Sequence, residues 1–240
     1  MDTILFLAII LAAAILQTST GFGFSILATP FLLIIFEPNE AIQINLLLSL
    51  LISGALIKKI FKDADFEILK RFLIGSVIGL PFGMVIFLTI DINKLKLGIS
   101  LMILGLTIML MLRFRIKQNK KRDLIVGGLS GFLTTSIGMP GPPLLLYFSG
   151  TDTHKEKLRA TTLAFYLFIY SISLIIQVIF AGTSKTVCVS SGVALPLVLV
   201  GLYLGQRLFK WINQKLFRIV TYIILLFTGI YLIIESFGHM

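Results

Sequence analysis

Apolar residues fill the chain in long blocks that short charged segments separate. Eight of these blocks contain no Asp, Glu, Lys or Arg. Most of them can cross a hydrocarbon core of about 30 Å as helices that rise about 1.5 Å per residue. The pattern therefore predicts an all-α membrane protein that is almost entirely embedded in the bilayer. The eight blocks are residues 3–36, 41–57, 72–90, 97–112, 124–151, 160–184, 186–206 and 219–234.

Two of the blocks are too long to be single straight spans. Residues 3–36 would form a helix of roughly 51 Å, and residues 124–151 one of roughly 42 Å. Each contains helix-breaking residues near its middle, Gln17–Gly23 in the first block and Gly138–Pro143 in the second. We therefore expect each block to form two half-length helices joined by an irregular tip, as a broken or re-entrant hairpin.

The two tips have similar sequences. The same three residue types recur at a spacing of 117 positions, as Thr18, Ser19 and Gly21 and again as Thr135, Ser136 and Gly138. A second match, at a spacing of 122 positions, relates Gly79–Gly83 to Gly201–Gly205. The matches predict a duplication with a first transmembrane repeat at 1–112, a basic cytoplasmic linker at 113–123 and a second transmembrane repeat at 124–240.

Composition and charge agree with a membrane location and select a topology. Only 13% of the 240 residues are charged and the mean hydropathy is +1.02, values that a water-exposed surface does not tolerate. If all eight blocks span the membrane, the 21 Lys and Arg residues divide 12 to 9 between its sides; if the two long blocks are re-entrant, they divide 18 to 3. The positive-inside rule favours the second arrangement. Each repeat then has three spans, so the repeats are inverted, and both termini face outward from the cell (inner) membrane.

The placement of the net charge and the few Cys and His residues argue against a nucleic-acid partner, a disulfide and a metal site. The net charge of +10 comes from Lys and Arg in short loops, which the positive-inside rule already explains, so we expect no nucleic-acid partner. Cys188 is the only cysteine, which excludes an internal disulfide and a Cys-rich metal site. His154 and His239 lie far apart in the sequence and form no metal pair. We predict no cofactor and no metal.

The two tips form the candidate binding site. Irregular backbone at membrane depth must be buried in protein or line a water-filled cavity. If the tips meet near the midplane, the N-termini of the two returning helices point at one place and favour a small anion. The second segment of each repeat lines the same cavity, and Arg159 can attract the anion. The candidate substrate-binding residues are Gln17, Thr18, Ser19, Thr20, Gly21, Gly23, Ser25, Asn45, Thr135, Ser136, Gly138, Gly141 and Thr162.

These motifs resemble those of a known family. At Thr20-Gly21-Phe22-Gly23 with Pro30 downstream, and again from Gly131 to Pro143, the chain resembles the sulfite exporter TauE/SafE family of membrane permeases. The resemblance covers nearly the whole chain. It implies transport of small sulfur-containing or organic anions, such as sulfite or sulfonates, coupled to an ion or proton gradient. Where the family has a run of consecutive glycines, this chain has Gly21-Phe22-Gly23 in the first half and Gly138-Met139-Pro140-Gly141 in the second. This departure bears on the substrate more than on the fold.

The sequence favours a secondary transporter that works by alternating access, and it leaves alternatives open. A passive anion channel would use the same dipole-lined constriction. In a membrane scaffold, the small residues of the tips would instead serve close helix packing. An intramembrane enzyme is disfavoured because it would need a nucleophile with a base, paired carboxylates or a set of metal ligands, and the apolar blocks contain no His, Asp, Glu or Lys. The exact anion, the direction, the coupling ion and a homodimer are left undetermined.

Overall fold

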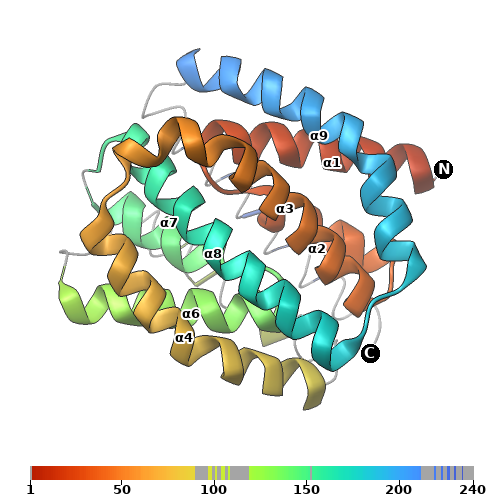
Figure 1. Ribbon diagram of the computed structural model, residues 1–240, viewed down its shortest axis with the longest axis horizontal. Coiled ribbons are helices and arrows are strands. Elements are labelled where there is room, and N and C mark those ends of the chain that lie inside the picture. The colour runs from red at the N-terminus through yellow and green to blue at the C-terminus, as the bar shows by residue number, and fades with distance from the viewer. Residues whose placement is uncertain are drawn as a thin grey trace.

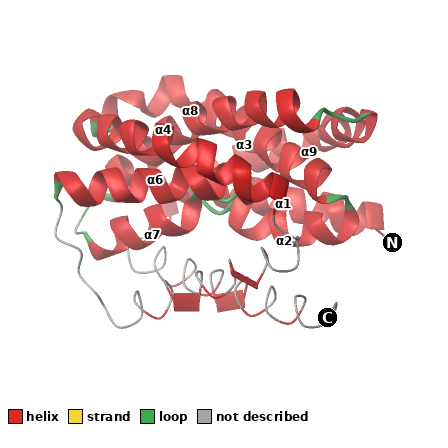
Figure 2. Cartoon of the chain, turned by 90° about the horizontal axis from the view of Figure 1, so that it is seen from below, coloured by secondary structure: helices red, strands yellow, loops and turns green. Residues whose placement is uncertain are grey.

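The computed structural model describes residues 2–89, 119–151 and 153–211, with scattered helical positions between 97 and 108 and between 219 and 234. Throughout these described residues the secondary structure is helical (Figures 1 and 2). Most of the blocks 97–112 and 219–234, and most of the predicted linker, lie outside them. The elements are α1 (Asp2–Thr20), α2 (Phe24–Ile35), α3 (Pro38–Ile60), η1 (Phe61–Asp63), α4 (Phe66–Thr89), α6 (Lys120–Ile137), α7 (Gly141–Gly150), α8 (Lys155–Ala181) and α9 (Lys185–Trp211).

Each of the two long apolar blocks is divided into two helices at glycines. Between α1 and α2, Gly21 and Gly23 have φ angles of 89° and 112°. After α6, Gly138 has a φ of 71° and caps the helix in the left-handed conformation. Glycine adopts these angles readily because it has no Cβ, whereas other residues pay a steric penalty. The chain therefore leaves the helix at the glycines of both tips.

The lengths of these helices correct the expectation of half-length elements. α2 and α7 are short, with 12 and 10 residues. α1 and α6, however, have 19 and 18 residues, which corresponds to roughly 27–29 Å. The expectation is wrong for α1 because half of a 34-residue block is already long, and wrong for α6 because that helix begins at Lys120, ahead of its block.

Glycines bring α9 onto α1 and α4 onto α6. A Cβ placed on Gly201 would lie 2.5 Å from the Cβ of Ala14, and one on Gly205 would lie 2.5 Å from the Cβ of Thr18. On α4, a Cβ at Gly79 would overlap the carbonyl oxygen of Gly128 in α6. The two glycine pairs matched in the sequence thus have the same role. Each packs a late helix of one half against the first helix of the other half.

α3 and α8 are paired with opposite directions (Figure 1). Near the start of α3, the Nδ2 of Asn39 donates to the carbonyl oxygen of Ala181 at the end of α8, at 3.2 Å. At the other end, the backbone N–H of Asp65 donates to the Oγ1 of Thr161 at 2.9 Å. The pair is therefore antiparallel. The location of each glycine tip can be described by which ends of α3 and α8 it contacts.

The outward faces of several helices are apolar. On α4 the exposed side chains recur at helical spacing. Among the described residues, α4, α8, α9 and the α3–η1 segment are long and apolar enough to cross a membrane. A continuous apolar stripe of this kind is unfavourable in water and favourable against lipid. The exposed apolar side chains of α4 include Ile74, Val77, Ile78, Phe82, Val85 and Leu88.

Candidate functional site

The turn after α1 lies directly against the start of α8. Gly21 has a positive φ, and an ideal Cβ on it would lie 2.9 Å from the Cα of Arg159 and 3.2 Å from its Cγ. Any larger residue at position 21 would collide with the backbone of α8. The missing side chain therefore allows the backbone of the first tip to contact Arg159.

Arg159 is a buried cation that has no ionic partner among the described residues. Arg159 is only 6% exposed, and neither its Nε nor its Nη2 has a hydrogen-bond partner. The guanidinium carbon lies 4.3 Å from the centre of the Phe209 ring, a cation–π contact that offsets only part of the cost of burial. Two unpartnered N–H groups of one guanidinium suit an oxyanion, which can accept both.

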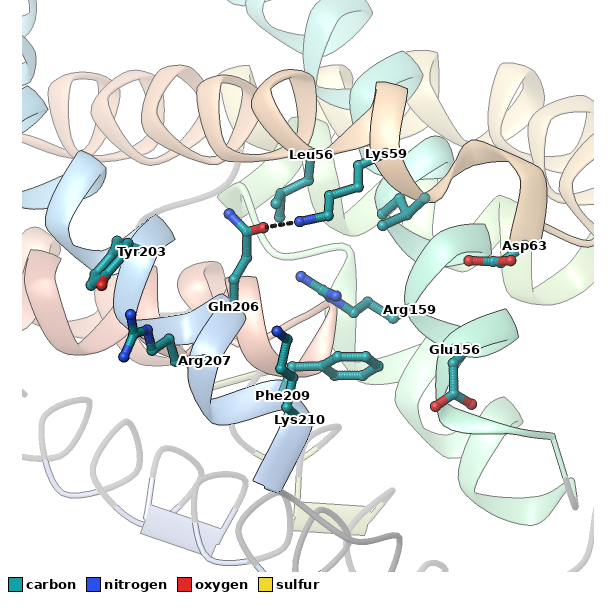
Figure 3. A pocket seen from close by; sticks show the side chains of 11 residues that line it. Leu56, Lys59, Asp63, Glu156, Arg159, Tyr203, Gln206, Arg207, Phe209 and Lys210 are labelled. Carbon is teal, nitrogen blue, oxygen red and sulfur yellow. Dashed lines mark hydrogen bonds between the residues drawn. The ribbon is translucent and has the colours of Figure 1, made fainter.

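A cavity of about 430 Å³ opens next to Arg159 (Figure 3). Four cationic side chains line it, from α3, α8 and α9, together with the carboxylates of Asp63 and Glu156. The ammonium of Lys59 donates to the Oε1 of Gln206 at 3.1 Å. An excess of positive charge in a concave site raises the local concentration of anions. The four cationic residues are Lys59, Arg159, Arg207 and Lys210.

The first turns of α2 and α7 meet deeper in the protein. A Cβ on Gly141 would lie 2.9 Å from the Cδ1 of Ile26 and 3.1 Å from the hydroxyl oxygen of Tyr166. Neither helix has a side-chain hydrogen bond at its N-cap. The hydroxyl of Tyr170 donates to the Oγ of Ser25 at 3.4 Å, whereas the buried hydroxyl of Tyr166 has no partner. Two positive helix ends and several hydroxyls thus lie close together.

The turn after α6 lies elsewhere along the α3–α8 pair. The Nδ2 of Asn45 donates to the carbonyl oxygen of Gly138 at 2.7 Å, and the Nε2 of Gln177 donates to the carbonyl oxygen of Thr135 at 2.9 Å. This turn is therefore near the start of α3 and the end of α8, while Gly21 is near the start of α8. The first turns of α2 and α7 meet, but the glycine turns lie toward opposite ends of the pair.

Four of the predicted hydroxyl groups already donate to backbone carbonyls. Ser19 and Thr20 both donate to Leu16, at 3.1 and 2.7 Å, within their own helix. A hydroxyl has a single proton, so a group that donates it to a carbonyl does not also donate to an anion. The other two, Thr135 to Leu80 and Ser136 to Phe132, have donor–acceptor distances of 2.8 Å each.

The other predicted polar residues are buried in the interior. The Nε2 of Gln17 donates to the carbonyl oxygen of Ser49 at 3.1 Å and lies 3.3 Å from the Oγ of Ser53. The hydroxyls of Thr18 and Thr162 are buried and have no partner. Because each unpaired buried hydroxyl costs free energy, these groups are candidates for contacts with a bound molecule.

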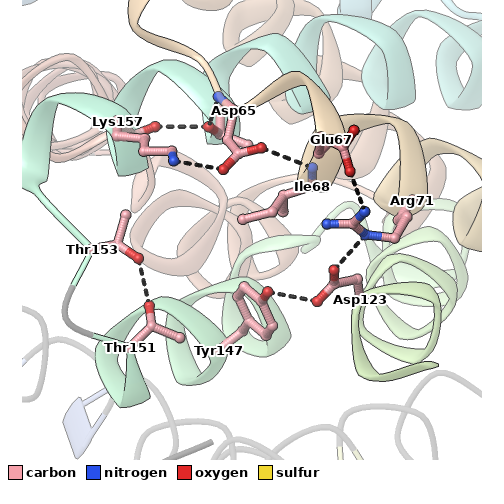
Figure 4. A network of polar contacts seen from close by, with 10 residues as sticks. Asp65, Glu67, Ile68, Arg71, Asp123, Tyr147, Thr151, Thr153 and Lys157 are labelled. Carbon is pink, nitrogen blue, oxygen red and sulfur yellow. Dashed lines mark hydrogen bonds and ion pairs between the residues drawn. The ribbon is translucent and has the colours of Figure 1, made fainter. Parts of the chain in front are cut away.

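A separate polar network connects α4, α6 and α7 (Figure 4). The carboxylate of Asp123, 1% exposed, accepts from the Nε of Arg71 at 2.6 Å and from the hydroxyl of Tyr147 at 2.6 Å. Arg71 also contacts Glu67 at 2.9 Å. The charge of Asp123 is thus compensated within the protein, which is typical of a structural ion pair. α6 begins at Lys120, so the last residues of the predicted linker 113–123 are helical.

Two features of this site were not predicted from the sequence. One is the role of Tyr166 and Tyr170, polar positions of block 160–184 for which interhelical hydrogen bonding was an equally good explanation. A signal existed, since Thr162, Tyr166 and Tyr170 follow one another at four-residue spacing and share one face of α8. The other is the set of three cations that line the cavity together with Arg159, namely Lys59, Arg207 and Lys210. These were assigned to the positive-inside rule, and no local pattern shows that α3, α8 and α9 bring them together.

Comparison with known proteins shows the family. The model of the sulfite exporter TauE/SafE family matches residues 5–232. The chain belongs to this family. As a TauE/SafE member it is an integral membrane protein that transports small sulfur-containing anions, and it is not an enzyme. Neither the curated proteins nor the solved structures that were compared include a significant match.

Proposed function

We propose that this TauE/SafE protein is a secondary transporter that binds a small oxyanion between Arg159 and the Gly21 turn. The observation that carries the proposal is the buried guanidinium of Arg159, which has two nitrogens without partners and faces a cavity rich in cations. A buried, unpaired charge is costly in a resting protein. A site that binds an anion during each transport cycle supplies the missing partner.

The arrangement supports a path for the anion. Arg207 and Lys210 would attract it into the cavity, which the positive-inside rule places on the cytoplasmic side. Arg159 would then hold it beside Gly21. Further in, the first turns of α2 and α7 offer two positive helix ends and the hydroxyl of Tyr166 as the next position.

Two relationships between the halves support an inverted repeat and alternating access. Gly21 lies against Arg159, and Gly138 lies against Ile42, with a spacing of 117 residues between the two glycines and between Ile42 and Arg159. α3 and α8, the equivalent helices of the two halves, are antiparallel. Inverted halves of this kind exchange inward-open and outward-open states by moving against each other around one site.

The thermal stability of the detergent-purified protein, measured against small anions, tests the proposal. The panel is sulfite, thiosulfate, sulfoacetate, taurine, acetate and sulfate, with chloride as the reference. At a concentration of 100 times its Kd, a bound anion stabilises the folded state by about 2.7 kcal/mol. We expect a saturable rise in Tm with at least one sulfur-containing anion.

Two substitutions locate the binding site. Arg159→Met should abolish the anion-dependent rise and leave the stability without anion equal or higher, because it removes an unpaired buried charge. Arg207→Met is the matched control, since Arg207 lines the same cavity but is exposed and stacks on Tyr203 at 4.9 Å. It should keep the rise, because an exposed charge that only steers the anion changes its rate of arrival rather than the equilibrium that the Tm reports. An unchanged rise in Arg159→Met would refute the site, and no rise with any anion would refute the proposed substrate class.

A further inference from the structure

The ends of α1 and α6 are equivalent in the two halves but differ in charge. The carbonyl groups of the last turn give the C-terminus of a helix a partial negative charge. The turn that ends α1 lies against the backbone and the Cβ and Cγ of Arg159, a residue that carries a positive charge. At the end of α6, the position equivalent to Arg159 is Ile42, whose Cγ2 would lie 3.4 Å from a Cβ on Gly138. One helix end therefore lies beside a cationic residue of the protein, and the equivalent end lies beside an alkyl side chain.

Two amide side chains border the end of α6 and present oxygen atoms without partners. Asn45 and Gln177 each donate their amide N–H to a carbonyl of the last turn, at Gly138 and Thr135. These bonds determine which way the amides face, because a carbonyl oxygen accepts only from a donor. The Oδ1 of Asn45 and the Oε1 of Gln177 have no hydrogen-bond partner, and both residues are 0% exposed.

A third oxygen lies on the same face of α8. Ser173 precedes Gln177 by four residues, which places the two side chains on neighbouring turns of one helix face. Its Oγ is also buried and has no partner. Buried oxygens of amides and hydroxyls, next to the negative end of a helix, form an environment that lacks positive charge.

We propose that a monovalent alkali cation binds at the last turn of α6, coordinated by the amide oxygens of Asn45 and Gln177. The donors are neutral oxygens, which suit a cation with a single charge, whereas divalent ions in proteins are usually held by carboxylates. In the described residues no group of three or more His, Cys, Asp or Glu side chains lies near enough to hold a metal. A proton is not an alternative occupant because amides do not titrate.

The bound cation would take the place in the second half that Arg159 has in the first. Discontinuous membrane helices use the C-terminal ends of half-helices in this way to bind the ions that drive transport. The role as a coupling ion rests on the proposed transport function. Binding itself does not, since the oxygens are present whether or not an anion binds near Arg159.

The test measures the Tm of the purified protein in NaCl, KCl and N-methylglucamine chloride at constant ionic strength and without any added substrate anion. We expect a saturable rise in Tm with Na⁺ or K⁺ over N-methylglucamine, and the more effective ion identifies the occupant. An equal Tm in all three salts would overturn the proposal. This readout does not depend on transport, so it can fail while the anion-dependent rise persists, or the reverse.

A charge substitution and a matched control locate the cation. Gln177→Lys places an ammonium where the amide was and retains a donor for the carbonyl of Thr135, so it should remove the cation dependence without lowering the Tm in N-methylglucamine chloride. Gln43→Lys is the control. The Nε2 of Gln43 donates to the carbonyl of Gly182 at 2.6 Å and to Asn39, not to a carbonyl of α6, and its buried Oε1 also has no partner. The proposal is overturned if Gln177→Lys retains the full cation-dependent rise, or if both variants lose it equally.

Discussion

The Cα of Arg159 lies 2.9 Å from the position that a Cβ on Gly21 would occupy. The turn between α1 and α2 and the start of α8 therefore meet through backbone, with no side chain from position 21 between them. Because Arg159 is also the unpartnered cation of the cavity, a displacement of this turn changes the space available beside its guanidinium. The contact connects the irregular tip to the charge that would bind the substrate.

Gly21→Ala should destabilise the protein and abolish anion-dependent stabilisation. A left-handed backbone costs a residue with a Cβ about 1–2 kcal/mol, and here the Cβ also collides with the backbone of α8. Gly182→Ala is the matched control, since Gly182 has a φ of 71° but nothing within 4 Å of its Cβ position. Thermal unfolding with and without the effective anion measures both effects. Equal losses of stability in the two variants would show that the contact with Arg159 does not matter.

Two tyrosine substitutions should have opposite effects on stability. The hydroxyl of Tyr166 is buried without a partner, so Tyr166→Phe should leave the free energy of unfolding unchanged or raise it by about 1 kcal/mol. Tyr170→Phe should lower it by about 1 kcal/mol, because the hydroxyl of Tyr170 donates to Ser25. If Tyr166 contacts the anion, Tyr166→Phe should also weaken anion binding about tenfold, or about 1.4 kcal/mol. Unchanged anion affinity in this variant would remove Tyr166 from the path.

Lys157→Met should lower stability in a pH-dependent way. Burial raises the pKa of Asp65. The ammonium of Lys157, 2.7 Å from the carboxylate, and the N–H of Ile68 lower this pKa by more than burial raises it, so the net shift is downward. A carboxylate with a lowered pKa stabilises the fold above its unfolded pKa of about 3.9, and this stabilisation disappears as the pH falls through the folded value.

The difference in stability between the wild type and Lys157→Met should therefore be constant near pH 7 and shrink below about pH 4. Its size should be at most about 1 kcal/mol, because Lys157 is half exposed. Chemical unfolding at a series of pH values measures the difference. The exposed residue Lys62 of η1 provides the control substitution Lys62→Met. A difference that grows as the pH falls would contradict the assigned ion pair.

The candidate site was predictable from the sequence only in part. Gly21, Gly138 and Arg159 were identified because helix-breaking residues in an apolar block, and a charge at its border, are local signals. The assignment of Ser19, Thr20, Thr135 and Ser136 as anion donors is not supported by the geometry, since their protons are donated to backbone carbonyls. Residue type does not reveal whether a hydroxyl near a helix end bonds to its own helix or to a ligand.

The sequence alone determined that the chain is a helical membrane protein, where its two long blocks break, and which family it resembles, because hydropathy, helix-breaking residues and short motifs are local properties. The tertiary structure decided that Gly21 contacts Arg159, that the glycine turns lie toward opposite ends of α3 and α8, and that Asn45 and Gln177 meet the end of α6. These contacts join residues far apart in the chain. They depend on how the helices pack, and one apolar sequence pattern is compatible with many packings.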